Sequence, residues 1–265
     1  MEYTLNVHGR LIDLHQPLVM GILNATPDSF YAASRKQAEQ DVADRVVEIL
    51  TQGGSIIDVG ACSTRPGGQL TDENEETTRL REALRIVRRE APDAVVSVDT
   101  FRPQVARMAV EEFGADIIND VGAPADSQQT MFRMVSHLRV PYIYMSRKSN
   151  MKEVLLDCAA ATDQLRSLGQ KDIILDPGLG FGKTLEQNYQ IMNELERMQM
   201  LGLPILVGIS RKSMIYRLLD TNPEQALNGT TVLNTIALLK GASILRVHDV
   251  NEAVECVRIV SATKS

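Results

Sequence analysis

A carboxylate, three glycines and a lysine follow a short apolar run in the middle of the chain, where residues 173–184 read IILDPGLGFGKT. The apolar run predicts a buried strand that Pro177 and Gly178 end, which leaves Asp176 at the carboxyl end of the strand, facing a cleft. The glycine spacing fits neither a P-loop nor a dinucleotide fingerprint. A tight turn between strand and helix is the ordinary alternative, because glycines serve turns more often than ligands.

Two further stretches carry groups that could contact an anion or a hard cation. Residues 24–30 read NATPDSF, and their polar side chains around a proline suit a cation or phosphates, although they also make an ordinary turn. Residues 62–68 read CSTRPGG and place an arginine and two hydroxyls between small residues, a composition typical of a mobile anion-contacting loop.

Basic side chains gather at two positions nearer the C-terminal end. Residues 208–213 read GISRKS and precede a helical pattern over 214–219, so Ser213 would lie at a helix start that attracts a carboxylate or phosphate, with two cations beside it. An N-cap serine with two solvated bases is the ordinary alternative. Arg246 and His248 are two residues apart on a predicted strand, so their side chains point the same way and can bind one anion.

A repeated unit must position these groups: a short apolar run, a polar residue or glycine, and a stretch with apolar residues at helical spacing. The eight apolar runs are residues 18–23, 55–59, 95–98, 117–118, 141–145, 172–175, 204–207 and 243–245, and the helical stretches include 37–51, 75–90 and 104–113. The alternation predicts a parallel sheet, and eight repeats predict closure as an α/β TIM (β/α)8 barrel, with a doubly wound open sheet as the alternative. Residues 3–14 predict a short N-terminal β-hairpin, and residues 1–265 read as a single domain.

The residue directly after each apolar run is mostly polar or glycine where a core would take valine or leucine. In chain order these residues are Asn24, Gly60, Asp99, Asn119, Ser146, Asp176, Gly208 and Arg246. In a barrel they form one ring at the C-terminal mouth, where barrel enzymes keep their chemistry. A helix cap explains any single one of them, but it does not explain several on successive strands.

Composition limits the classes of function. A formal net charge of -6 and a pI near 5.3 argue against nucleic acid as a partner, because neutralising phosphates requires a basic face. The cysteines at 62, 158 and 256 are widely spaced and odd in number, so free thiols in a reducing compartment are expected. No apolar segment has the length of a signal peptide or a membrane span, so we expect no membrane partner and a cytoplasmic location.

Taken in order, these motifs resemble those of dihydropteroate synthase over nearly the whole length of the chain. The matching stretches are 24–30, 63–67, 99–100, 119–120, 175–184, 210–213 and 246–248. The resemblance implies a monofunctional TIM-barrel enzyme that joins 7,8-dihydropterin-6-ylmethyl diphosphate to 4-aminobenzoate, with Mg²⁺, and releases pyrophosphate and 7,8-dihydropteroate. It also implies a homodimer through residues 214–219 and 232–239, although a stripe that faces the core explains their apolar character equally well.

The same resemblance assigns roles to residues. Catalytic roles fall to Asn24, Thr64, Arg65, Lys212, Arg246 and His248. The pterin would be bound by Asp99, Asn119, Met145, Asp176, Lys212 and Arg246, and the aminobenzoate by Thr64, Pro66, Phe181, Lys212 and Ser213. Pyrophosphate would be held by Thr64, Arg65, Arg246 and His248, and Mg²⁺ by Asn24. A pterin edge presents a ring N–H beside an amine, a donor pair that matches the two oxygens of Asp176.

Three departures from the family pattern leave alternatives open. Residues 30–34 read FYAAS where the family has Asp-Gly-Gly, Cys62 replaces a glutamate, and residues 144–146 replace a histidine-bearing motif. One alternative is a pterin-binding methyltransferase barrel, which would not need the groups that hold a diphosphate. The other is a pterin-binding paralogue without catalytic activity.

The sequence predicts that pyrophosphate and Mg²⁺ build the aminobenzoate site. Asn24, Thr64 and Arg65 lie on the two loops that we expect to move, whereas Arg246 and His248 lie on the barrel rim, so anion binding would order the loops. Aminobenzoate should bind poorly to the free protein or its pterin complex, and well once pyrophosphate and Mg²⁺ are added. Calorimetric titration under both conditions checks this, and equal affinities would mean that the slot is preformed.

Overall fold

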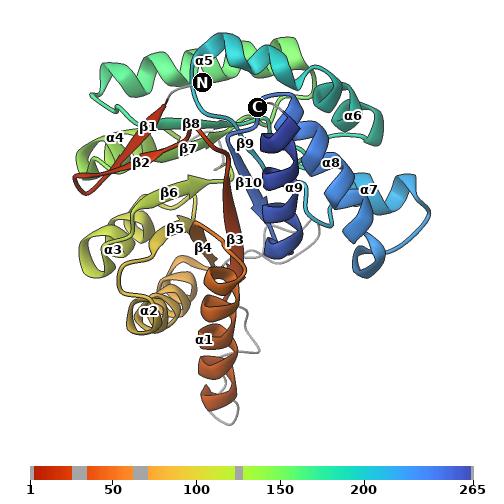
Figure 1. Cartoon of the computed structure of the whole chain (residues 1–265). Helices are drawn as coiled ribbons and strands as arrows, with labels where there is room; N and C mark the ends of the chain where they lie inside the picture. The colour runs from red at the N-terminus through yellow and green to blue at the C-terminus, as the bar shows by residue number, and fades with distance from the viewer. Residues whose placement is uncertain (1–2, 26–34, 62–70, 123–127, 264–265) are drawn as a thin grey trace.

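Eight parallel strands form a nearly closed barrel in the computed structural model, which describes residues 3–25, 35–61, 71–122 and 128–263 (Figure 1). In chain order the strands are β3 (Leu18–Asn24), β4 (Ile56–Gly60), β5 (Val95–Asp99), β6 (Ile117–Asp120), β7 (Tyr142–Met145), β8 (Ile173–Asp176), β9 (Leu206–Val207) and β10 (Ile244–Val247). Their order around the sheet is β8-β7-β6-β5-β4-β3-β10-β9. A parallel bridge joins Leu175 of β8 to Ile205, the residue directly before β9, so the predicted barrel is confirmed and the open sheet is excluded.

Helices surround this barrel in the described part of the chain. They are α1 (Arg35–Thr51), α2 (Glu73–Glu90), α3 (Pro103–Phe113), α4 (Gln128–Leu138), α5 (Met151–Ser167), α6 (Leu185–Asn193), α7 (Ser213–Leu218), α8 (Leu227–Leu239) and α9 (Val250–Thr263), with 3-10 helices η3 (Leu195–Leu201) and η4 (Pro223–Gln225). Local sequence fixes several starts: Asp72 caps α2 through the Glu75 N–H at 2.9 Å, and Thr184 and Gln187 form a capping box at α6. No helix in the described ranges is both long and apolar enough to cross a bilayer.

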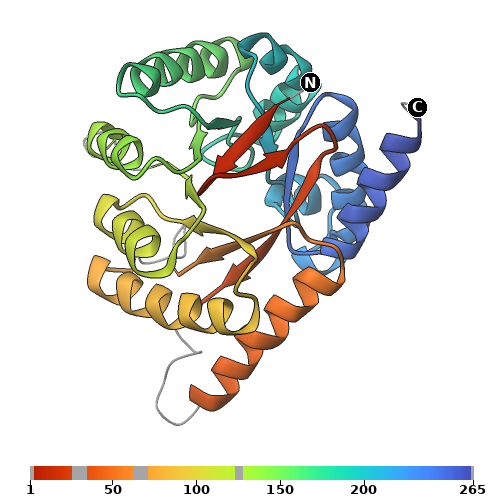
Figure 2. The ribbon, with the colours of Figure 1, turned by 60° about the vertical axis from the view of Figure 1, so that its left-hand side comes forward.

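One apolar side chain from every strand fills the end of the barrel at which the strands begin, and we call this layer the floor. These side chains are Met20, Ile56, Val95, Ile117, Ile143, Ile174, Leu206 and Ile244. The predicted N-terminal hairpin is present as β1 (Thr4–Val7) and β2 (Arg10–Asp13), which cross the end of the barrel in Figure 2. Leu5 and Val7 of the hairpin, with Leu14, pack on this apolar layer. Hydrophobic burial therefore closes the end of the barrel where the strands begin.

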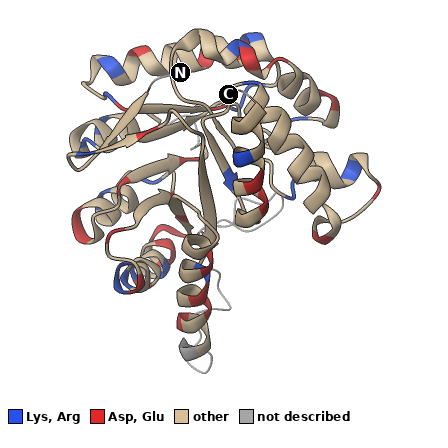
Figure 3. Ribbon diagram, viewed as in Figure 1, with Lys and Arg blue, Asp and Glu red and all other residues tan. Residues whose placement is uncertain are grey.

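The predicted elements agree with the observed ones to within one or two residues at most ends. The predicted run 204–207 yields only the short β9, Leu206–Val207, and the helix predicted over 214–219 is α7, Ser213–Leu218. In the view of Figure 3, both basic and acidic residues are spread over the helices around the barrel.

Candidate functional site at the C-terminal mouth of the barrel

A polar layer lies directly above the apolar floor of the barrel. Side chains two apart on a strand point the same way, so the residue two beyond each floor residue also faces the interior. These residues are Ile22, Asp58, Ser97, Asn119, Met145, Asp176, Gly208 and Arg246. The layer therefore brings together five polar side chains from five strands, as well as two apolar ones.

Arg246 is the centre of this layer. Its Nε donates to Asp58 Oδ2 at 2.6 Å, and its Nη2 donates to Asp99 Oδ2 at 2.7 Å. Asn119 Nδ2 donates to the same Asp58 oxygen at 3.1 Å. Burial raises the pKa of Asp99 to about 7 although Arg246 opposes that shift, whereas burial would lower the pKa of Arg246 and the two carboxylates raise it above its usual value.

Asp58 was not among the predicted site residues. The sequence pointed to Gly60, which follows the apolar run, but Asp58 lies inside that run and is fully buried. A charged residue within an apolar strand was the signal that could have found it, because burying an unpaired carboxylate is costly. Among the described residues, Asp58 Oδ1 and the Oγ of Ser97, its neighbour on β5, have no hydrogen-bond partner. These two buried oxygens could therefore bind a ligand or a water molecule.

Asp176 and Lys212 form the second charged group of the mouth. Asp176 is buried, and its Oδ1 accepts a hydrogen bond from the Gly178 N–H at 2.7 Å. Burial raises the pKa of Asp176, while Lys212 opposes that shift most. Burial also lowers the pKa of Lys212 to about 8, and its ammonium lies 4.2 Å from the centre of the Phe181 ring and donates to the Leu179 carbonyl.

The loop between β8 and α6 is shaped by glycines that side chains could not replace. Gly178 has φ of 69°, and a Cβ there would lie 2.1 Å from the Ser146 carbonyl oxygen. Gly180 has φ of 83°, and its Cβ would lie 2.6 Å from Lys212 Cδ. Lys183 closes the loop by donating to the Gly178 carbonyl at 2.7 Å, so this lysine binds its own loop.

Several predicted residues line the edge of this mouth. Met145 is buried and belongs to the interior layer, Phe181 and Ser213 are half-buried, and α7 begins at Ser213 as predicted. Asn24 ends β3 and is exposed. The predicted residues Thr64, Arg65 and Pro66, together with Cys62, lie outside the described residues, as do the polar residues that follow Asn24 on the first loop.

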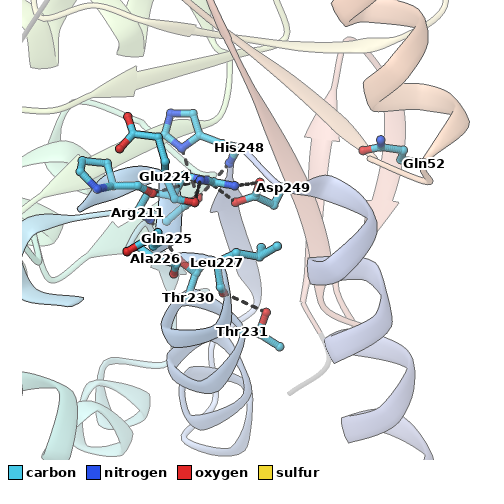
Figure 4. Close-up of polar contacts among 12 residues, drawn as sticks. Gln52, Arg211, Glu224, Gln225, Ala226, Leu227, Thr230, Thr231, His248 and Asp249 are labelled. Carbon is cyan, nitrogen blue, oxygen red and sulfur yellow. Dashed lines mark hydrogen bonds and ion pairs between the residues drawn. The ribbon is translucent and has the colours of Figure 1, made fainter. Parts of the chain in front are cut away.

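The expectation for Arg211 is wrong. The sequence suggested that Arg211 is a cation for an anion at Ser213, but its guanidinium binds both oxygens of Asp249 at 2.9 and 2.8 Å (Figure 4). Ser146 is also not part of the interior ring, because its Oγ donates to Asp157 on α5 at 2.7 Å. Neighbouring side chains on a strand point to opposite faces, so Met145 faces inward where Ser146 faces the helices.

Arg246 lies on β10 and His248 lies directly after Val247, the last residue of that strand, and the two side chains have different partners. Arg246 binds the two carboxylates, whereas His248 Nδ1 lies 3.2 Å from Ser210 Oγ and its backbone N–H donates to the same oxygen at 3.1 Å. Burial and then Arg246 lower the pKa of His248 to about 4, so its imidazole is neutral near pH 7. Joint anion binding by these two residues stays a prediction.

Comparisons of sequence and of structure with known proteins find the same family. The family described as pterin binding enzyme matches residues 20–248. The dihydropteroate synthase of Clostridium beijerinckii is 40% identical over 244 residues, covering 88% of this chain and 89% of that protein, and that of Escherichia coli K12 is 35% identical over 273 residues, covering 97% and 95%. A Xanthomonas albilineans dihydropteroate synthase solved with 4-aminobenzoic acid superposes with a TM-score of 0.92 at 32% identity, covering 100% of this chain and 99% of that one.

Asp176→Asn should weaken binding of a pterin by roughly 30- to 1000-fold, about 2 to 4 kcal/mol, and leave the fold intact. The new Oδ1 can still accept from the Gly178 N–H, so the amide would turn its NH2 toward the donor pair of the pterin. Calorimetry with a pterin, beside circular dichroism, measures both effects. Asp172→Asn, before the other end of β8, is the matched control, and near-normal binding by Asp176→Asn would show that another group receives the pterin.

Proposed function

The chain belongs to the dihydropteroate synthase family of pterin-binding enzymes, and on that premise we propose that the polar layer at the mouth of its barrel is where the reaction of the family takes place. That reaction joins 7,8-dihydropterin-6-ylmethyl diphosphate to 4-aminobenzoate and releases pyrophosphate. The observation that carries the placement is the buried Asp176 beside Lys212, in a layer that also holds Asp58 and Arg246, with Asp99 bound to Arg246 just above it. Several polar groups that converge at one end of a barrel are typical of a ligand site.

The pterin would lie across the interior layer. Asp176 would accept its ring N–H and amine, because Oδ2 remains available beside the Oδ1 that binds Gly178. Asp99 and Asn119 would contact the opposite edge, and Met145 would pack on the ring. Arg246 would cover the other ring face, where a guanidinium stacks well on a flat heterocycle.

The aminobenzoate would lie between the β8–α6 loop and the start of α7. Its carboxylate suits the backbone N–H groups at Ser213 and the Lys212 ammonium, and its ring suits the Phe181 side chain. Thr64 and Pro66 would complete this slot from the second loop. Lys212 would thus contact both substrates, which its position beside Asp176 and Phe181 supports.

Thr64 and Arg65, with Arg246 and His248, would hold the diphosphate and then the pyrophosphate. Asn24 would be the ligand of Mg²⁺ from this chain, and it fits that role because it offers an exposed, hard amide oxygen at the mouth. A cation that takes most of its oxygens from phosphates and water needs no cluster of protein ligands, and within the described ranges none is found. When bound, Mg²⁺ would supply positive charge to the leaving diphosphate.

The chemistry breaks the bond between the methylene carbon and the diphosphate oxygen and forms a bond from that carbon to the amine nitrogen. Pyrophosphate leaves with the electron pair, and the amine proton passes to water. The positive charge on the methylene carbon spreads into the pterin ring, where the Asp176 carboxylate that accepts the ring N–H would stabilise it, whereas Asp58 and Asp99 are paired with Arg246. Arg246 stays protonated throughout, because two carboxylates hold its pKa high. No side chain has to act as a strong base.

Pyrophosphate release tests the activity directly. The protein should release pyrophosphate when the pterin diphosphate, aminobenzoate and Mg²⁺ are all present, and omission of aminobenzoate should abolish product formation. A coupled phosphate assay and chromatography of 7,8-dihydropteroate measure the two products. Pterin binding without release would instead indicate a paralogue that lacks the activity.

We further propose that two copies associate through α7, α8 and α9, which lie side by side in Figure 1. Large apolar side chains are exposed there: Leu218, Leu219, Val232, Leu239 and Ile259 are each more than half exposed. A stripe that faced the core would be buried, so the exposure favours an interface for these residues. We also place this single-domain chain in the cytoplasm, where the free thiols of Cys158 and Cys256 would stay reduced.

Leu239→Asp should convert the dimer to a monomer, because a carboxylate would be buried without a partner in the interface. Analytical ultracentrifugation of the variant and the parent measures the change in mass. Leu11→Asp on the hairpin, where the side chain is 67% exposed, is the control and should leave the mass unchanged. A parent protein that sediments as a monomer would contradict the proposed interface.

A further inference from the structure

We propose that Arg211 is a positioning residue that fixes the loop between β9 and α7 to the start of α9, so that Lys212, Ser213 and His248 keep their places at the mouth. The inference rests on the proposed roles of those three residues and goes beyond them, because Arg211 itself contacts neither substrate in that arrangement. The partners of its guanidinium are Asp249, Pro223 and Glu224, none of which belongs to the proposed site (Figure 4).

The side chain of Arg211 joins its own loop to two other segments, η4 and the residue before α9. Its Nε and Nη2 donate to the two oxygens of Asp249 at 2.9 and 2.8 Å, directly before α9. Its Nη1 donates to the carbonyls of Pro223 and Glu224 on η4, at 3.0 and 2.9 Å. The pair is partly buried, with 27% of the arginine side chain and 16% of the aspartate side chain exposed, so solvent screens it less than a surface pair.

The backbone of Arg211 needs this support. Its φ is 53°, in the left-handed region where residues other than glycine are rare. Its N–H donates to Thr230 Oγ1 on α8 at 3.0 Å, and that buried hydroxyl donates to the Ala226 carbonyl at 2.8 Å. Such a conformation persists where the surroundings over-determine it, and here side chain and backbone are both held.

The residues on either side of Arg211 are those that face the site. Ser210 binds both the backbone N–H and the ring of His248, and Lys212 reaches the β8–α6 loop. Arg45 on α1 donates to the His248 carbonyl at 2.5 Å and to the Ile22 carbonyl at 3.1 Å, which ties the same rim to β3. Arg211 therefore connects the aminobenzoate end of the site with the pyrophosphate end.

The test removes the ion pair between Arg211 and Asp249 without changing any residue of the proposed site. Arg211→Asn deletes the guanidinium but tolerates the left-handed backbone, and Asp249→Asn deletes the charge at the other end with a side chain of nearly the same size. Arg211→Lys keeps the charge but loses the two-pronged contact. Arg81→Gln is the matched control, because Arg81 also binds both oxygens of one carboxylate, that of Glu112, at 2.9 and 2.7 Å on α2 and α3.

Three measurements separate positioning from general stability: hydrogen exchange of the amides at 208–214, the aminobenzoate dissociation constant with pyrophosphate and Mg²⁺, and the pterin dissociation constant. We expect Arg211→Asn and Asp249→Asn to speed that exchange and weaken aminobenzoate binding by roughly tenfold or more, with pterin binding changed less than about threefold. Of the proposed pterin contacts only Lys212 lies on this loop, whereas those on β5, β6, β7, β8 and β10 do not, so pterin binding should be weakened less than aminobenzoate binding. Arg211→Lys should recover part of the loss, and Arg81→Gln should change none of the three.

Unchanged exchange at 208–214 in both Arg211→Asn and Asp249→Asn would overturn the inference. Faster exchange with unchanged aminobenzoate affinity would also overturn it, and would show that aminobenzoate does not bind at Ser213. Pyrophosphate release by the parent protein is measured separately, so loss of this inference leaves the test of the proposed activity intact. If Arg211→Asn does not fold, Asp249→Asn and Arg211→Lys give the same readouts.

Discussion

The C-terminal mouth of the barrel depends on one guanidinium that neutralises carboxylates from two other strands. Arg246 on β10 bonds to Asp58 on β4 and Asp99 on β5, and Asn119 adds a donor to Asp58. Breaking a buried ion pair by removing one partner leaves an uncompensated charge, which costs far more than the intact pair gains. The charged interior is therefore tolerated only as a complete set, and the ends of four strands are held in register by it.

The barrel makes such a set possible by separating its interior into layers. One apolar residue from each strand forms the floor, the N-terminal hairpin covers that floor, and two residues further along each strand the polar layer begins. Because the groups stand on strands rather than on loops, their dipoles and charges are fixed before a ligand arrives. The half-buried Lys212, on a loop, needs other anchors, and it finds them in the Leu179 carbonyl and the Phe181 ring.

The sequence predicted the strands, the hairpin and the barrel well, because short apolar runs alternating with helical stretches leave few other folds. It also predicted Asp176 and Asp99 at strand ends, where a polar residue interrupts a pattern. It missed Asp58, since a position inside an apolar run does not reveal which face it occupies. It also misread Arg211, because its partner Asp249 is 38 residues away in the sequence and only the fold brings them together. Motifs made of neighbouring residues can be recognised in the sequence, whereas an ion pair between two distant elements depends on how those elements pack.

The glycines of the β8–α6 loop limit how this site can change over evolutionary time. A side chain at Gly178 would collide with the Ser146 carbonyl, one at Gly180 would collide with Lys212, and both positions have backbone angles that favour glycine. Substitutions that alter the mouth of the barrel are therefore expected at positions outside this loop. An inhibitor that made most of its contacts with this loop would meet a surface that mutation cannot readily remodel without displacing the lysine beside Asp176.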